Sequence, residues 1–110
     1  MGVTKTDYFT EKQNKIATIM KALGHPARIA IIDLLLESDR CICGDIVNEL
    51  QLAQPTISQH LKELKNAGLI KGNIEGASIC YCIQKNTFNE FQKYLTAVFG
   101  VLEKQEKYCC

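Results

Sequence analysis

The sequence lacks the features that mark several classes of protein. No stretch approaches the roughly twenty consecutive apolar residues that cross a bilayer, and the first residues contain no apolar signal-peptide core. The formal net charge is only +1, so no overall basic character predicts binding to nucleic acid or membranes. These absences predict a soluble cytoplasmic protein. An anionic partner would have to bind to a local patch of positive charge.

Sequence signals of catalysis are also missing. The chain contains no Gly-rich phosphate loop, no Ser/His/Asp set in a defensible context, and no Cys-x-x-Cys beside a strand-helix-strand unit. No internal repeat or linker divides the 110 residues, which are enough for one compact domain and too few for two. We therefore expect a single domain over residues 1–110 and no enzyme.

Apolar residues at spacings near 3.6 predict helices in five parts of the chain. The first is expected over residues 7–24 and ends at Gly24. The second is expected over residues 25–38, with Pro26 in the first turn, which tolerates proline. The apolar positions that repeat in this second helix are Ile29, Ile32, Leu35 and Leu36.

The other three helices are expected over residues 44–52, 53–69 and 87–107. The helix over 53–69 turns Ile57, Leu61 and Leu64 inward and stops at Gly68. The last helix has one broad apolar stripe, which consists of Phe88, Phe91, Leu95, Val98, Phe99 and Leu102.

Before the last helix the apolar period changes to two. Apolar residues alternate with serine and cysteine over residues 78–83, and Glu75-Gly76 supplies a turn, which predicts a β-hairpin. Cys80 and Cys82 are expected on the face opposite the apolar residues. The predicted fold class is mainly α with a small β-hairpin, in the order helix-helix-helix-helix-hairpin-helix, which is the arrangement of a winged helix-turn-helix.

The fourth helix has the composition of a DNA-recognition helix. Opposite its apolar stripe it has polar and basic side chains that can approach base edges or phosphates. An ordinary solvated helix face is the alternative. His60 lies beside the apolar stripe and is expected to be a packed structural residue. The residues predicted to contact DNA are Gln54, Thr56, Ser58, Gln59, Lys62 and, in the hairpin, Lys71.

The run from Leu23 to Ile83, with "LGHPARIAIIDLL" and "CICGDIVNELQLAQPTISQHLKELKNAGLIKGNIEG", resembles the ArsR/SmtB family of metal-responsive bacterial repressors. The resemblance implies a homodimeric winged-helix repressor that binds double-stranded operator DNA without a cofactor and is released by an inducer. Where the family usually has a serine cap on the recognition helix, this chain has Ala53, so the cap is weaker or partly replaced by Gln54.

A dimer is also expected from the apolar terminal helices, because so small a domain cannot bury all their faces alone. The last helix adds Tyr94 and Val101 outside its main stripe. A symmetric partner would cover these side chains. Packing of the last helix on its own core is the alternative.

Six cysteines fall in three close couples, Cys41/Cys43, Cys80/Cys82 and Cys109/Cys110. Partners within a couple are poorly placed for an unstrained disulfide, and the chain shows no sign of secretion, so thiols are expected.

The resemblance also suggests what the first couple does. Family members that sense arsenite, antimonite, cadmium or lead have Cys-x-Cys at the start of the helix before the recognition helix, and Cys41 and Cys43 match that position. Thiolates suit such soft ions, so the predicted inducers are As(III), Sb(III), Cd(II) and Pb(II). Buried cysteines without a chemical role are the alternative. Ile46 replaces a third cysteine of some arsenic sensors, which leaves Cys109 and Cys110 as candidate ligands.

Two further hypotheses concern the sensor. The last helix contains no histidine, which argues against the zinc or cobalt site that other family members build there. Cys80 and Cys82 could form a second thiolate couple, although a strand that tolerates small side chains is favoured. A repressor of the same fold that responds to thiol oxidation or persulfides is the alternative function.

Overall fold

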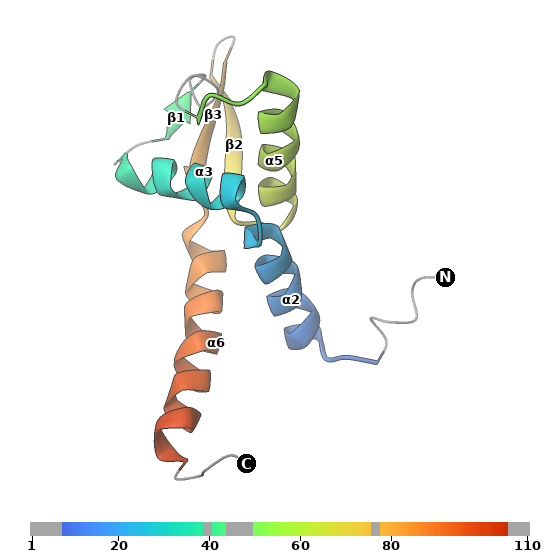
Figure 1. Ribbon diagram of the computed structural model, residues 1–110, viewed down its shortest axis with the longest axis vertical. Helices are drawn as coiled ribbons and strands as arrows, with labels where there is room; N and C mark the ends of the chain where they lie inside the picture. The colour runs from blue at the N-terminus through green and yellow to red at the C-terminus, as the bar shows by residue number, and fades with distance from the viewer. Residues whose placement is uncertain (1–7, 39–40, 44–49, 76–77, 106–110) are drawn as a thin grey trace.

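The protein structure, a computed structural model, describes residues 8–38, 41–43, 50–75 and 78–105. Helices α3 and α5 and the three strands form the upper body in Figure 1, and α2 and α6 extend below it. In chain order the elements are α2 (Glu11–Leu23), α3 (Pro26–Glu37), β1 (Ile42–Cys43), α5 (Gln54–Asn66), β2 (Ile70–Glu75), β3 (Ser78–Ile83) and α6 (Lys85–Lys104).

Local capping explains where α2 and α3 begin. The backbone N–H of Gln13 donates to Thr10 Oγ1, and the backbone N–H of Thr10 donates to Gln13 Oε1, both at 3.0 Å, which forms a capping box. His25 caps α3 by accepting from the backbone N–H of Ala27 at 3.0 Å, and Pro26 follows in the first turn. The predicted end of the first helix at Gly24 and the predicted place of Pro26 in the first turn of the next helix are confirmed.

Helix α5 begins without a side-chain cap. Ala53 occupies the capping position, and the side chain of Gln54 donates to Ser58 Oγ at 3.1 Å. Gln54 therefore does not replace the missing cap. Gly68, with a φ of 79°, ends the helix as expected, since glycine adopts this left-handed conformation at little cost.

The core lies where α2, α3, α5 and the first residues of β2 meet. Ile32 and Leu35 of α3 are buried as expected, but Ile29 and Leu36 are 42% and 63% exposed, and Ile31 is fully buried instead. The other buried core residues are Ile16, Ile19, Ala22, Ile57, Leu61, Leu64, Leu69 and Ile70.

The strands form one antiparallel sheet in the order β1-β3-β2. The β2–β3 hairpin is confirmed, but β1 was not expected, because its two residues are too few to show a period. Cys43, predicted at a helix start, lies in β1 opposite Cys80 of β3, and Ile42 lies opposite Tyr81. Residues 44–49, most of the predicted third helix, lie outside the described residues.

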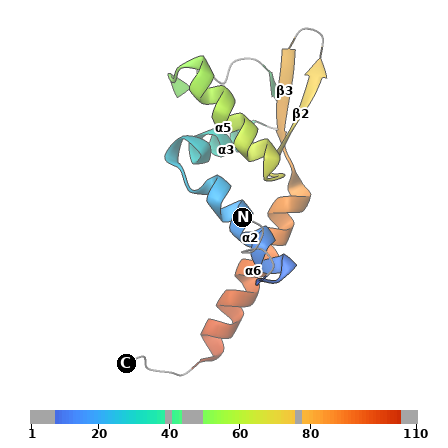
Figure 2. The same ribbon diagram turned by 90° about the vertical axis from the view of Figure 1, so that its right-hand side faces the viewer.

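Helix α6 runs away from the body of the molecule (Figures 1 and 2). It spans 20 residues, none of them buried. Lys15 of α2 forms an ion pair with Glu90 of α6 at 2.8 Å, which joins the first half of α2 to the first half of α6. Among the described residues, no helix is both long enough and apolar enough to cross a membrane.

Candidate nucleic-acid interface and thiol site

The recognition face of α5 is exposed along its whole length. Ile57, Leu61 and Leu64 hold the opposite side of the helix against the core. The predicted DNA contacts on α5 are all exposed, and so is Lys71 at the beginning of β2. The fold therefore leaves accessible the side chains predicted to contact DNA, which are Gln54, Thr56, Ser58, Gln59, Lys62 and Lys71.

Gln59 makes one contact on the helix surface. Its amide nitrogen donates to Glu63 Oε2 at 3.0 Å, one turn along α5. An exposed pair at this spacing stabilises a helix by only about 0.2–0.5 kcal/mol, so a base edge could replace it at small cost. The amide of Gln59 thus remains available for a bidentate contact to adenine.

A recess of about 190 Å³ separates α5 from β3. Lys62 and Lys65 line it together with Ser58, Leu61 and Tyr81. Lys65 is not among the residues that the sequence predicts to contact DNA. Its position three residues after Lys62 was the available signal, because side chains at that spacing lie side by side on a helix.

His60 connects α5 to the preceding helices. It is buried, and its Nδ1 accepts a hydrogen bond from Arg28 Nε at 3.1 Å. Arg28 also donates to the backbone carbonyl of Ala22 at 3.3 Å, and the His25 ring centroid lies 4.5 Å from that of His60. Burial, followed by the nearby His25 and Arg28, lowers the pKa of His60. The expectation of a packed residue is confirmed.

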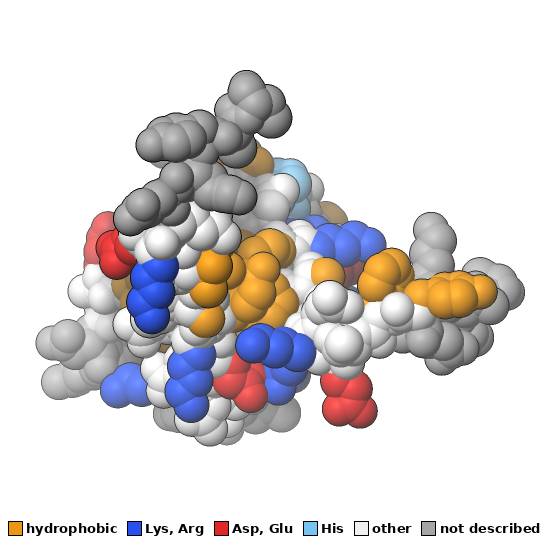
Figure 3. Space-filling view, turned by 90° about the horizontal axis from the view of Figure 1, so that it is seen from below, with side chains coloured by type: hydrophobic (Ala, Val, Ile, Leu, Met, Phe, Trp, Pro, Cys, Tyr) orange, Lys and Arg blue, Asp and Glu red, His pale blue; other side chains and the backbone are white. Residues whose placement is uncertain are grey.

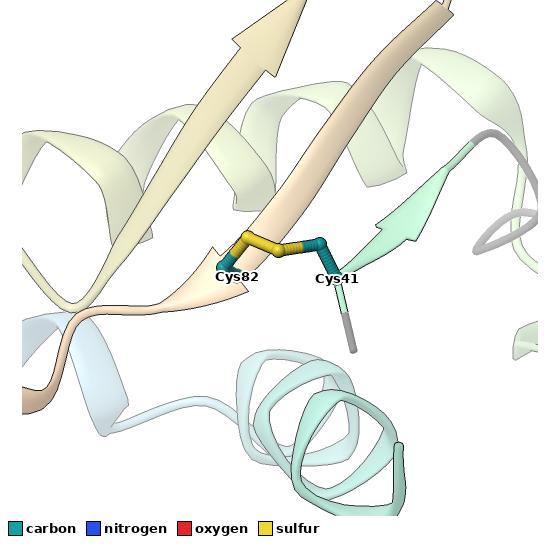
Figure 4. The surroundings of a disulfide bond; sticks show 2 residues. All are labelled: Cys41 and Cys82. Carbon is teal, nitrogen blue, oxygen red and sulfur yellow. A yellow bond between two sulfur atoms is a disulfide. The ribbon is translucent and has the colours of Figure 1, made fainter. Parts of the chain in front are cut away.

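A disulfide joins Cys41 to Cys82, across the β1–β3 pair (Figure 4). Their Cα atoms are 4.5 Å apart, which suits a directly opposite, non-hydrogen-bonded pair in an antiparallel sheet. The prediction of thiols was based only on disulfides between the two cysteines of one couple. It was wrong for these two residues, because the sheet pairs cysteines that are 41 residues apart in the chain.

Cys80 lies in the interior. Its side chain is 1% exposed, and the register places it with Cys82 on the face opposite Ile79, Tyr81 and Ile83, as expected. Cys80 is itself disulfide-bonded, and the residue opposite it in the register is Cys43. The preference for a strand that merely tolerates small side chains is therefore overturned for both Cys80 and Cys82.

Other predicted ligands are not placed. Cys109 and Cys110 lie outside the described residues, as does the side chain of Cys43. Within the described part of the chain, no group of three or more His, Cys, Asp or Glu side chains is arranged to hold a metal ion. The metal ligands predicted from the sequence, Cys41, Cys43, Cys109 and Cys110, remain predictions.

Helix α6 exposes an apolar surface near its C-terminal end. Phe99 is 60% exposed, and Val101 and Leu102 are each more than half exposed. Seen from the end of the molecule where α2 and α6 extend, hydrophobic side chains gather with Lys and Arg around them (Figure 3). Apolar side chains exposed in this density are typical of an interaction surface.

Two kinds of comparison with known sequences agree. Residues 25–71 match the family described as bacterial regulatory protein, arsR family. An uncharacterised HTH-type transcriptional regulator of Methanocaldococcus jannaschii is 44% identical over 84 residues, which are 76% of this chain and 93% of that protein. The arsenical resistance operon repressor of Staphylococcus xylosus is 30% identical over 95 residues, which are 86% of each chain.

Solved structures show the same fold. An ArsR family transcriptional regulator matches with a TM-score of 0.75 at 20% identity, covering 88% of this chain and 99% of that one. A homodimeric winged helix-turn-helix DNA-binding domain from Mycobacterium bovis matches with a TM-score of 0.63 at 24% identity, covering 92% and 97%. Fold, exposed recognition helix and family match together show that this chain belongs to the ArsR family of winged helix-turn-helix transcriptional regulators, and is a DNA-binding regulator rather than an enzyme.

Proposed function

We propose that the protein is a repressor that binds operator DNA as a homodimer and is released when Cys41 and Cys82 are oxidised to a disulfide. The observation that carries this proposal is the Cys41–Cys82 bond itself. It joins β1 to β3, and β3 forms the wing with β2. The bond therefore connects the chain just before the helix-turn-helix to the wing that accompanies it on DNA.

The recognition face of α5 binds the major groove in this proposal. Gln59 contacts an adenine, and Lys62 and Lys71 contact phosphates on either side. Gln54, Thr56 and Ser58 contact base edges or phosphates near the beginning of the helix. Phosphate contacts fix the register of the protein on DNA, and the base contacts determine its sequence preference.

The terminal helices α2 and α6 form the dimer interface. A second copy of the chain covers the exposed Phe99, Val101 and Leu102. The homodimeric relative of the same fold supports this arrangement. A twofold dimer presents its recognition helices about 34 Å apart, which matches successive major grooves of an inverted-repeat operator.

The oxidation requires an oxidant, for which we propose a hydroperoxide. The exposed thiolate of Cys41 attacks the peroxide oxygen, which breaks the O–O bond, forms a sulfenic acid and releases an alcohol or water. The thiolate of Cys82 then attacks the Cys41 sulfur and displaces hydroxide, which leaves as water after protonation. Two thiols lose two electrons, and the peroxide gains them. Cys41 reacts first because it is more exposed than the half-buried Cys82.

A thiophilic inducer is the second candidate. Similarity to an arsenical resistance operon repressor along 86% of the chain favours it. In this version Cys41 and Cys43 bind As(III), Sb(III), Cd(II) or Pb(II), and Cys109 or Cys110 supplies a third thiolate. The Cys41–Cys82 bond must then be reduced before the ion binds, because a disulfide sulfur is a poor ligand.

The test follows operator binding by fluorescence anisotropy in Cys41→Ser and Cys82→Ser variants. The wild-type protein should release DNA on addition of hydroperoxide, and both variants should stay bound. A Cys109→Ser, Cys110→Ser protein is the matched control and should release like the wild type. Normal release by Cys82→Ser would refute the disulfide switch. Release of that variant by arsenite but not by peroxide would support the second candidate.

DNA docking is tested separately. Gln59→Ala should reduce discrimination between operator and mutated sites by about 1–3 kcal/mol. Lys62→Ala and Lys71→Ala should weaken binding to all sequences and lower the slope of log K against log salt by about 0.9 each. Lys104→Ala, at the far end of α6, is the control. Unchanged affinity in all three interface variants would contradict this docking.

A further inference from the structure

We propose that the recess between α5 and β3 binds one phosphate of the DNA backbone. The residues that line it are Ser58, Leu61, Lys62, Lys65 and Tyr81. This site rests on the proposed function, because its ligand belongs to the DNA that α5 is proposed to read. It makes positioning residues of Lys65 and Tyr81, which the proposed docking does not use.

The chemistry of the recess suits an oxyanion. In the described part of the chain it is lined by two ammonium groups, two hydroxyl groups and one leucine, and by no carboxylate. Lys62 and Lys65 are three residues apart on α5, so they extend from the same side of the helix and their charges repel each other. A phosphate between them replaces this repulsion with two charge-assisted hydrogen bonds.

Ser58 has a proton to donate to this phosphate. The side-chain amide of Gln54 donates to Ser58 Oγ at 3.1 Å and occupies one lone pair of that oxygen. A hydroxyl has one O–H donor besides its two lone pairs. The contact with Gln54 therefore holds the Ser58 oxygen in place and leaves its O–H for a phosphate oxygen.

Tyr81 reaches the recess from the wing. In the register it lies opposite Gly72 of β2, which is the edge strand of the sheet and contacts α5. A Cβ at position 72 would lie 3.2 Å from Tyr81 Cε1, so the ring packs over the glycine backbone, where a side chain would displace it. Glycine inside a strand often marks such a close approach. Gly72 thus gives the ring its place beside α5.

The position of the recess matches the path of a DNA strand. In the proposed docking α5 occupies the major groove, and the β2–β3 wing beside it lies over the adjacent minor groove (Figures 1 and 2). A sugar–phosphate backbone separates these two grooves, so it passes between the helix and the wing. The recess lies between α5 and β3, and one phosphate of that backbone therefore meets its lysines and hydroxyls together.

Lys71 belongs to a different contact. It lies opposite Cys82, and neighbouring residues of a strand face opposite sides of the sheet, so Lys71 and Tyr81 are on opposite faces. The recess therefore binds a phosphate other than the one assigned to Lys71. Because Lys71 is also an exposed lysine beside the proposed DNA surface, Lys71→Ala is a matched control for Lys65→Ala.

The first measurement compares variants of the reduced full-length protein on operator DNA. Lys65→Ala should lower affinity about tenfold for all sequences and lower the slope of log K against log salt by about 0.9. Tyr81→Phe keeps the ring over Gly72 and removes only the hydroxyl, so it should lower affinity about fivefold without changing the slope. Both variants should keep the wild-type midpoint of urea denaturation. Unchanged affinity in Lys65→Ala, on DNA that the wild type binds, would overturn the proposal.

The second measurement replaces the operator phosphates one at a time with neutral methylphosphonates. At one position the replacement should weaken the wild type and Lys71→Ala by the same factor. It should have little effect there on Lys65→Ala, because that variant has already lost the contact. Equal losses in all three proteins at every position would overturn the phosphate site and leave the repressor intact.

Two other outcomes are distinct from these. Failure of the reduced wild type to bind any duplex would refute the repressor and, with it, the phosphate site. Titration with inorganic phosphate tests for a free anion instead. Phosphate binding that depends on Lys65, together with an unchanged affinity of Lys65→Ala for DNA, would assign the recess to a free anion and overturn the proposal.

Discussion

Helices α5 and α6 have similar amphipathic sequences but different environments. Helix α5 buries Ile57, His60, Leu61 and Leu64, whereas none of the 20 residues of α6 is buried. An apolar stripe predicts that a helix has a partner, but it does not say whether the partner belongs to the same chain. Helix α5 finds its partners in the core, and α6 has an apolar end that a second chain is proposed to cover.

The largest expected effect comes from truncating the buried side of α5. Leu64→Ala removes a side chain with no exposure, so the free energy of unfolding should fall by about 3 kcal/mol. Urea denaturation should show this loss at every protein concentration, because the residue packs within one chain. A loss well below 1 kcal/mol would contradict the conclusion that α5, unlike α6, is held by packing within its own chain.

The matching change on α6 should affect assembly instead. Phe99→Ala should weaken the proposed dimer by about 2 kcal/mol, as expected of an aromatic anchor in an interface. Analytical ultracentrifugation measures the dissociation constant, and Lys104→Ala is a control on the same helix. Stability should fall at low protein concentration and recover at high concentration. An unchanged dimer would place the interface elsewhere.

The pH dependence of stability should show the effect of burying His60, which lies on the inner side of α5. The pKa of His60 is lowered in the folded protein, so the unfolded chain binds the proton more tightly. Stability should therefore be fully present above the ordinary pKa of 6.5 and be lost as the pH falls below it. His60→Gln should be less stable overall but should show a flatter profile. A wild-type profile that rises as the pH falls through this range would contradict the assignment.

The smallest effect is expected where α6 touches its own chain. Lys15 and Glu90 form an ion pair between exposed side chains, and such pairs are typically worth about 0.2–1 kcal/mol. Lys15→Ala should lower the unfolding free energy by no more than this, and the loss should shrink in high salt. A larger loss, insensitive to salt, would mean that the contact between α2 and α6 is stronger than an exposed pair provides.

Helix α5 could be predicted closely because its pattern is unambiguous. Three apolar residues at helical spacing define a single stripe, and Gly68 ends the helix in a left-handed conformation. Helix α3 is apolar almost all around, so its period could not distinguish Ile31, which is fully buried, from Ile29, which is 42% exposed. Only the packing of α2, α5 and β3 around α3 decides between such residues.

The sequence by itself determined the local structure: the capping at Thr10 and His25, the hairpin, the recognition helix and the family to which the chain belongs. The tertiary structure alone decided the chemistry of the cysteines. Cys41 and Cys82 are 41 residues apart, and the two-residue strand β1 leaves no periodic signal. The physical reason is that capping and helix period depend on neighbours within a few residues, whereas strand pairing and register are set by long-range contacts across the sheet.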